Sequence, residues 1–427
     1  MAVRELEPAF TGSPEPEPPA EQRSWHKRWL AAWSWLDRPL TPGVAAALGI
    51  LGFVLARWQR WSQGRISDWI LVGSRFATRP QLAPGVGIRQ NSTGYDGQFY
   101  YRLAINPADL AHTAYGITLD APYRLMRIGY PVLTWLASAG HGGLVPVMLV
   151  VVNAAAMAVM GWLGGVFARR GGHHAAWGLL LPCYFGLLTS VSRDTAEPVA
   201  CAFLLAGLLA LRGRRPVLAG LLLAFGALTR ETVIVAACAV ALVRVTGLIR
   251  RRARPGREDL AWVLPAVVFA GWELIVKAVT GSVPLFADDD RNAGAPFAAA
   301  YDAVKYNLST LSWSQFSWTD IWLLEFAVLA ALAVMALACL RATRVPAHER
   351  VALVLFVIEI CVVTPTTWDS LNADLRSFVE VYLMALVVLL GVPRARWSRP
   401  GAWLLPVAAT WAVPALLVVG GRRVFWS

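Results

Sequence analysis

The chain alternates between long apolar runs and short polar or basic turns. A helix needs about 20 predominantly apolar residues to cross a bilayer, and it satisfies its own backbone hydrogen bonds there. The candidate spans are residues 43–58, 144–168, 175–191, 196–211, 216–243, 260–280, 321–340, 351–365, 378–392 and 402–420. The pattern predicts an all-α fold, a polytopic transmembrane helical bundle.

Two segments decide how many spans the pattern contains. The run 216–243 is too long for one span and is interrupted by the polar cluster 229–232, which predicts two helices that meet there. The segment 128–138 is short and opens with Tyr130-Pro131, so it is either a half-helix or a full span. If it does not span, the bundle has about eleven spans, within a range of ten to twelve.

Composition agrees with a membrane domain. Of 427 residues, 57% are hydrophobic and 15% are charged, against about 25% charged residues in soluble domains. Residues 29–427 are predicted to form one transmembrane domain, while the Pro- and Glu-rich stretch 13–20 predicts a disordered cytoplasmic tail over 1–28. The five cysteines form no C-x-x-C pair and are expected to be core residues.

The basic residues predict the orientation of the bundle. The net charge of +12 comes almost entirely from arginines between apolar runs, which indicates membrane lipid as the counter-charge and no nucleic acid partner. With the N-terminus in the cytoplasm, every basic cluster of the short loops falls inside. These clusters are 23–28, 169–174, 212–215, 250–257, 341–350 and 394–399. The Arg and Ala bias is typical of a GC-rich bacterial genome, so the bundle is expected in a bacterial plasma membrane. In this orientation 59–127 becomes a large extracytoplasmic loop.

Asp96 is the first candidate for chemistry. It lies in this outer loop between Gly94 and Gly97, ahead of the aromatic stretch 98–104, which predicts a helix on the membrane surface. Its carboxylate would then stand at the membrane–water boundary, where a lipid-linked and a water-soluble substrate could meet. The alternative is that Asp96 only caps the following helix.

Further ionisable groups lie on the same side of the predicted bundle. Asp194 and Glu197 stand at a helix start, where acids either cap the helix and suit its dipole or line a site. Arg230 and Glu231 lie where two spans meet, and they either form an ion pair or serve a site.

Arg376 begins the apolar run 378–392 from the outer side, where an arginine suits a phosphate group. It could equally pair with Asp369 or Asp374. The three adjacent carboxylates 288–290 are more typical of a solvated loop than of a metal site. The sequence has no Walker loop, which disfavours an ATP-driven pump.

The layout resembles the GT-C superfamily of integral membrane glycosyltransferases, in particular bacterial relatives of the PIG-M and PIG-V type mannosyltransferases. The resemblance rests on Asp96 in the first outer loop, the aromatic stretch 98–104, and the segments Arg127–Leu133 and Leu222–Val233. These motifs are short, while the layout covers most of the chain.

The resemblance implies a mechanism and a set of site residues. Asp96 would act as general base in an inverting transfer from a polyprenyl-phosphate sugar to a glycan, lipid or protein acceptor. The sugar would be a hexose or pentose, with mannose as one candidate. No acidic residue stands directly beside Asp96, so the acidic pair of the superfamily is absent. Dependence on a divalent metal therefore stays open, and no cofactor is certain. The expected substrate-binding residues are Gln98, Tyr101, Arg127, Asp194, Glu197, Arg230, Glu231 and Arg376.

Two other functional classes are compatible with a membrane bundle. A transporter or flippase of a lipid-linked sugar favours inverted repeats and ionisable groups near the midplane, whereas the charges here gather at one face and no repeat is visible. A non-catalytic membrane protein would not need a carboxylate where the loop meets a surface helix.

The predicted orientation can be tested by thiol labelling of intact cells. Cysteines introduced at Asn91 and Ser282 should react with a membrane-impermeant reagent, and one at Gly256 should not, because only the first two lie on the outer side. The parent chain gives the background from its own cysteines. Labelling at Gly256 without labelling at Asn91 would invert the topology.

Overall fold

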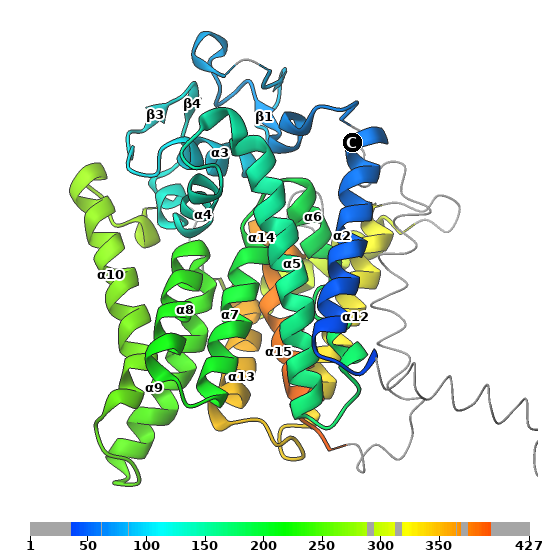
Figure 1. Cartoon of the computed structure of the whole chain (residues 1–427), viewed down its shortest axis with the longest axis vertical. Helices are drawn as coiled ribbons and strands as arrows, with labels where there is room; N and C mark the ends of the chain where they lie inside the picture. Colours follow the sequence, from blue (N-terminus) through cyan, green and yellow to red (C-terminus); the bar gives the residue numbers. More distant parts are fainter. Residues whose placement is uncertain are drawn as a thin grey trace, which may run out of the picture.

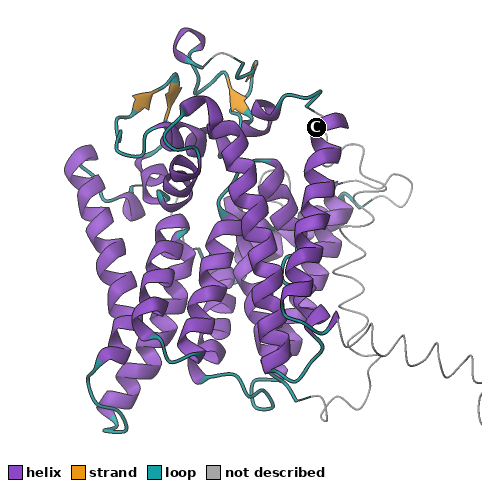
Figure 2. Ribbon diagram, in the orientation of Figure 1, coloured by secondary structure: helices purple, strands orange, loops and turns teal. Residues whose placement is uncertain are grey.

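The computed structural model describes residues 36–60, 62–83, 85–287, 294–311, 318–363, 365–368 and 375–393. Helices make up 71% and strands 3% of the structure. The helices stand side by side in a bundle, and the short strands lie at one end of it (Figures 1 and 2). The predicted tail 1–28 and the last predicted span 402–420 lie outside the described residues.

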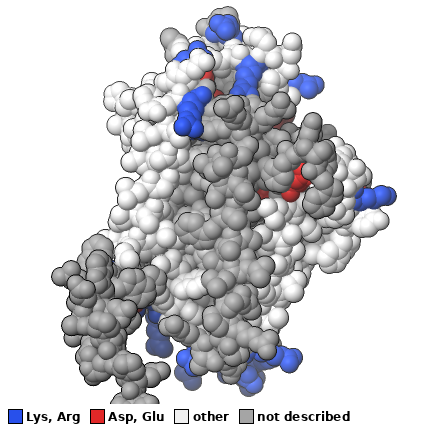
Figure 3. Space-filling view, turned by 90° about the vertical axis from the view of Figure 1, so that its right-hand side faces the viewer, with Lys and Arg blue, Asp and Glu red and all other residues white. Residues whose placement is uncertain are grey.

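Four described helices are long and apolar enough to cross a membrane. They are Leu40–Arg60, Gly142–Arg170, Glu231–Ile249 and Arg257–Thr280, which contain α2, α5 (Val145–Arg170), α9 (Ile234–Ile249) and α10 (Leu260–Thr280). Large apolar side chains on their outer faces are exposed, among them Leu48 at 65% and Leu274 at 63%. Such faces are costly in water and suit contact with lipid tails. Figure 3 shows blue Lys and Arg side chains at both ends of one face and mostly white residues among the described atoms between them.

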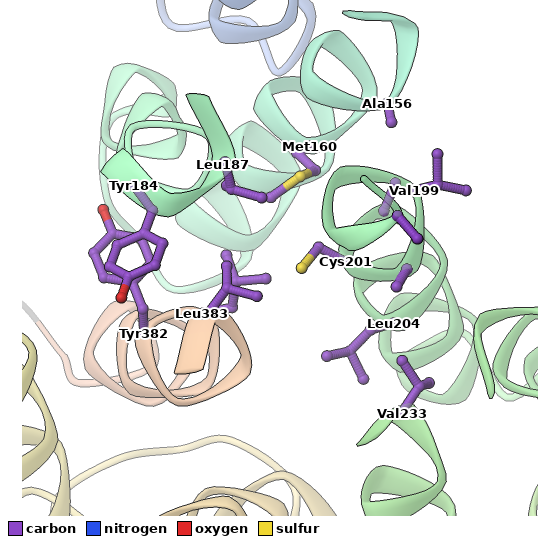
Figure 4. Close-up of a cluster of buried hydrophobic side chains, with 14 of the residues drawn as sticks. Ala156, Met160, Tyr184, Leu187, Val199, Cys201, Leu204, Val233, Tyr382 and Leu383 are labelled. Carbon is purple, nitrogen blue, oxygen red and sulfur yellow. The ribbon is translucent and has the colours of Figure 1, made fainter. Parts of the chain in front are cut away.

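Further helices complete the bundle. They are α6 (Phe185–Ser192), α7 (Glu197–Arg212), α8 (Pro216–Thr229), α11 (Ala298–Ser309), α12 (Trp318–Ala338), α13 (Ala347–Val362), α14 (Pro365–Trp368) and α15 (Val379–Leu390). Every residue of α15 is buried, as expected for a helix that is apolar on all sides except at Glu380. The ring of Tyr382 stacks on the ring of Tyr184, the residue directly before α6, with centroids 4.7 Å apart (Figure 4).

A cap of short elements covers one end of the bundle. It contains the parallel pair β1 (Val72–Gly73) and β2 (Ile88–Arg89), the antiparallel pair β3 (Thr113–Ala114) and β4 (Ile117–Thr118), and α3 (Gly97–Ile105). We call residues 62–127 the cap. It coincides with the predicted outer loop.

The predicted break in the long run 216–243 is confirmed. α8 ends at Thr229, Arg230 is extended with φ −154° and ψ 123°, and a 3-10 turn over Glu231–Val233 leads into α9. The nine-residue α4 (Gly129–Ala137) packs against this break, since a Cβ on Gly129 would lie 2.8 Å from the Thr229 nitrogen. At about 1.5 Å per residue, α4 is too short to span, so of the two alternatives for 128–138 the half-helix is observed.

Two expectations were wrong. The segment 175–191 is not one helix but a 3-10 turn over Ala175–Leu180 followed by α6, because Pro182 cannot continue a helical hydrogen-bond ladder. The stretch 98–104 forms the expected helix, α3, but Gly97–Ala104 are all buried. This helix therefore packs inside the protein and presents no face to a membrane surface.

The packing of this broken segment can be tested where α5 closely approaches the turn at Gly178. A Cβ on Gly164 would lie 2.9 Å from the Gly178 Cα, so Gly164→Ala should destabilise the protein by about 1–3 kcal/mol. The control, Gly52→Ala in α2, has open space around its Cβ and should cause no loss. Thermal unfolding in detergent measures both. Equal melting temperatures for the two variants would contradict this packing.

Candidate functional site

The cap holds Tyr95 and Asp96 in place through Gln98. The Gln98 side-chain amide donates to the Thr93 carbonyl oxygen at 2.8 Å, and its oxygen accepts from the Gly73 N–H at 3.1 Å. Both partners are backbone groups of the cap, and Gln98 is almost fully buried. The side chain fixes the chain directly ahead of α3, and its contact with substrate stays a prediction.

Asp96 is bound by two arginines from distant parts of the chain. Its Oδ1 accepts from Arg124 Nη1 and its Oδ2 from Arg376 Nη2, both at 2.8 Å. Its backbone is helical and its side chain makes no cap hydrogen bond, so the capping alternative is not observed. Burial alone would raise the pKa of Asp96, but the two guanidinium groups more than offset it and hold the pKa well below its usual range.

Arg376 joins the cap to the bundle. It begins the 3-10 turn that leads into α15, and its Nε donates to the Tyr95 hydroxyl oxygen at 3.0 Å. It also forms an ion pair with Glu197 at the start of α7. The alternative partners Asp369 and Asp374 lie outside the described residues. Arg376 thus contacts two predicted site residues, Asp96 and Glu197.

Arg124 was missed by the sequence argument. It pairs with Asp96 and with Asp120, the latter at 2.7 Å, and its guanidinium group lies 4.5 Å from the Phe99 ring centroid. Its position in the same outer loop, three residues before Arg127, was the available signal.

A second pair of ion pairs lies at the break between α8 and α9. Arg127 Nε donates to Glu231 at 2.8 Å, and Arg230 Nη1 lies 3.0 Å from Glu380 of α15. Arg230 and Glu231 therefore do not pair with each other, and each binds a residue far away in the chain. Glu380 was missed, although an acid inside the apolar run 378–392 was a visible signal.

Asp194 and Tyr101 are not part of these pairs. Asp194 is fully buried with φ +52°, and neither of its carboxyl oxygens has a hydrogen-bond partner in the described part of the chain. Burial raises the pKa of its carboxyl well above its usual range. Tyr101 is also fully buried, and no partner is found there for its hydroxyl group. No capping role is observed for Asp194, and its contact with substrate stays a prediction.

The joint between cap and bundle thus collects alternating charges. We call this set the joint network: Tyr95, Asp96, Asp120, Arg124, Arg127, Glu197, Arg230, Glu231, Arg376 and Glu380. The side chains of Asp96, Arg124 and Arg376 are 19%, 12% and 10% exposed, so the network is accessible at Asp96 and closed at Glu197, which is 2% exposed. Such a network could bind an anion through its arginines, and it could equally serve structure alone.

The residues at the joint do not fit a divalent cation. Both oxygens of Asp96 and one of Glu197 already accept hydrogen bonds from guanidinium groups, so a cation there would meet the positive charges of Arg124 and Arg376. Among the described residues, no group of three or more His, Cys, Asp or Glu side chains could hold a metal ion. The acidic run 288–290 lies outside them.

Comparison of the chain with protein-family models, with curated proteins and with solved structures found no match. Its function therefore has to be argued from the residues and their geometry.

Proposed function

We propose that the chain is an inverting membrane glycosyltransferase of the GT-C type, with about eleven spans and its active site on the extracytoplasmic side of a bacterial plasma membrane. The donor would be a sugar on a polyprenyl phosphate. The observation that carries the proposal is Asp96, a partly exposed carboxylate held between two arginines where the cap meets the bundle.

The carboxylate supplies the base that such a transfer needs. The acceptor hydroxyl gives its proton to Asp96 while its oxygen forms a bond to the anomeric carbon of the sugar. The bond from that carbon to the phosphate oxygen breaks, and the electron pair leaves with polyprenyl phosphate. The depressed pKa keeps Asp96 ionised in the free protein, where the two arginines also make it a weak base.

The arginines supply the counter-charge for the phosphate. Guanidinium groups bind phosphate in a bidentate manner, and such charge-assisted hydrogen bonds are among the stronger ones. A donor phosphate at Arg124 and Arg376 would compete with Asp96 for their positive charge. Asp96 would then become more basic when the donor is bound, so that the base is active only in the complex that needs it.

The short helices around the joint give a lipid-linked donor a way in. α8 has 14 residues and is about 21 Å long, while the hydrocarbon core is about 30 Å thick. If α8 begins at the inner boundary of that core, the break at Arg230 would lie about 9 Å below its outer boundary, close to the level of a lipid-linked phosphate. A polyprenyl phosphate could reach the joint network by lateral movement.

Removal of the base tests the proposal most directly. Asp96→Asn keeps the shape but cannot accept the proton, so turnover should fall by roughly 10²- to 10⁴-fold in a reconstituted assay with radiolabelled polyprenyl-phosphate sugars. Asp96→Glu should recover little, because a displacement of about 1 Å can cost roughly 10²-fold.

The control for this experiment is Asp109→Asn. Asp109 is another acidic residue of the 62–127 cap, and its carboxylate accepts a hydrogen bond from the Ala111 N–H. The turnover of this variant should stay near that of the parent chain. Retention of a folded state by Asp96→Asn is checked by its melting temperature, since the variant loses an anionic partner of two arginines. A folded, fully active Asp96→Asn protein would rule out Asp96 as the base.

The phosphate role of Arg376 predicts a separate kinetic effect. Arg376→Ala should raise the apparent KM for the donor by about 10- to 100-fold, as expected when a charge-assisted hydrogen bond worth about 1.5–3 kcal/mol is lost. The matched control is Arg212→Ala. Arg212 is the last residue of α7, at the end away from the joint, and the substitution breaks its ion pair with the buried Glu349. It should lower stability and leave KM unchanged. An unchanged donor KM in folded Arg376→Ala would assign this arginine to structure alone.

A further inference from the structure

A second charged region lies at the end of the bundle opposite the cap (Figure 1). The turn between α7 and α8 and the segment ahead of α10 enclose a groove of about 600 Å³. Its polar side carries Arg214, Arg215 and Arg257, and its apolar side carries side chains of the first turns of α8. We call it the basic groove. It belongs to the predicted inner face and shares no residue with the joint network.

The three arginines of the basic groove lack acidic partners. All three are exposed, and none forms an ion pair within the described residues. The single acid of the groove, Glu258, is bound to Arg244 of α9. The groove therefore carries a net positive charge, in contrast to the paired arginines at the joint.

The start of α8 points more positive charge into the same groove. Pro216 has no N–H and the Ala219 N–H donates to the Arg215 carbonyl oxygen at 2.9 Å, so the N–H groups of Val217 and Leu218 are the ones in the first turn without a helical acceptor. The positive end of the helix dipole favours an anion at this position, phosphate in particular. The dipole and the three arginines thus act in the same direction.

The apolar side of the groove continues along α8. Val217, Leu218 and Leu221 are 42%, 43% and 53% exposed, and their spacing of three and four residues puts them on one face of the helix. Gly220 lets α8 approach α10 closely, because a Cβ there would lie 3.1 Å from the Leu264 Cβ. The groove therefore has a basic mouth and an apolar wall formed by the first turns of α8.

We propose that the basic groove binds an anionic phospholipid, with the phosphate on the arginines and an acyl chain along α8. A soluble phosphate would leave the exposed leucines in water, whereas a neutral lipid would leave the three arginines without a counter-charge. Basic pockets between helices on the cytoplasmic side are suited to acidic lipid headgroups. The lipid would hold the α7–α8 turn and the start of α10 together.

Native mass spectrometry of the full chain in a neutral detergent tests this proposal. Titration with phosphatidylglycerol should give a saturable adduct, and the triple variant Arg214→Ala, Arg215→Ala, Arg257→Ala should weaken its binding on the order of 10- to 100-fold. The matched control replaces three exposed arginines of the neighbouring loop, Arg250, Arg251 and Arg252, by alanine. It should change binding by less than about threefold.

Two further ligands separate the possible sources of the anion. Phosphatidylcholine should bind far more weakly than phosphatidylglycerol, and soluble glycerol 1-phosphate should raise the melting temperature much less. Equal losses in both triple variants would indicate diffuse attraction and overturn the proposal, as would equal effects of glycerol 1-phosphate or phosphatidylcholine. These readouts measure binding alone, so they do not depend on the proposed transferase activity.

Discussion

Arginines buried between the cap and the bundle need anionic partners, because an unpaired charge at this depth costs several kcal/mol. Arg376 meets this need by binding Asp96 of the cap and Glu197 of α7. Arg127 and Arg230 do the same with Glu231 of the 3-10 turn before α9 and Glu380 of α15. The cap is therefore attached to the helices through charge pairs as well as apolar contacts, and loss of one partner would leave another charge buried.

The same requirement determines where the helices begin and end. An ionisable side chain inside a continuous lipid-facing helix would have no partner, whereas a break allows the chain to turn charges inward. α8 therefore ends before Arg230, and a turn leads into α9. The starts of α7 and α15 bring Glu197 and Glu380 to the same region. The helices are short here because they end where their charged residues turn inward to form the joint network.

The two ends of the bundle solve the problem of positive charge differently. At the cap, each arginine of the joint network has a carboxylate partner, and this pairing gives Asp96 its depressed pKa. At the opposite end, Arg214, Arg215 and Arg257 stay exposed beside an apolar helix face and lack such partners among the described residues. The first end carries the proposed transferase site, and the second carries the proposed lipid site.

Local pattern was sufficient for helices whose length follows from apolar runs: the predicted 260–280 matches α10, and the polar cluster 229–232 correctly marked the end of α8. It placed Asp96, Glu197 and Arg376 on one side of the membrane, but it named neither Arg124 nor Glu380. Only the tertiary structure decided that Arg376 binds Asp96, 280 residues away, and that α3 is buried. Helix formation depends on neighbours a few residues apart, whereas charge pairing and burial depend on which distant segments pack together.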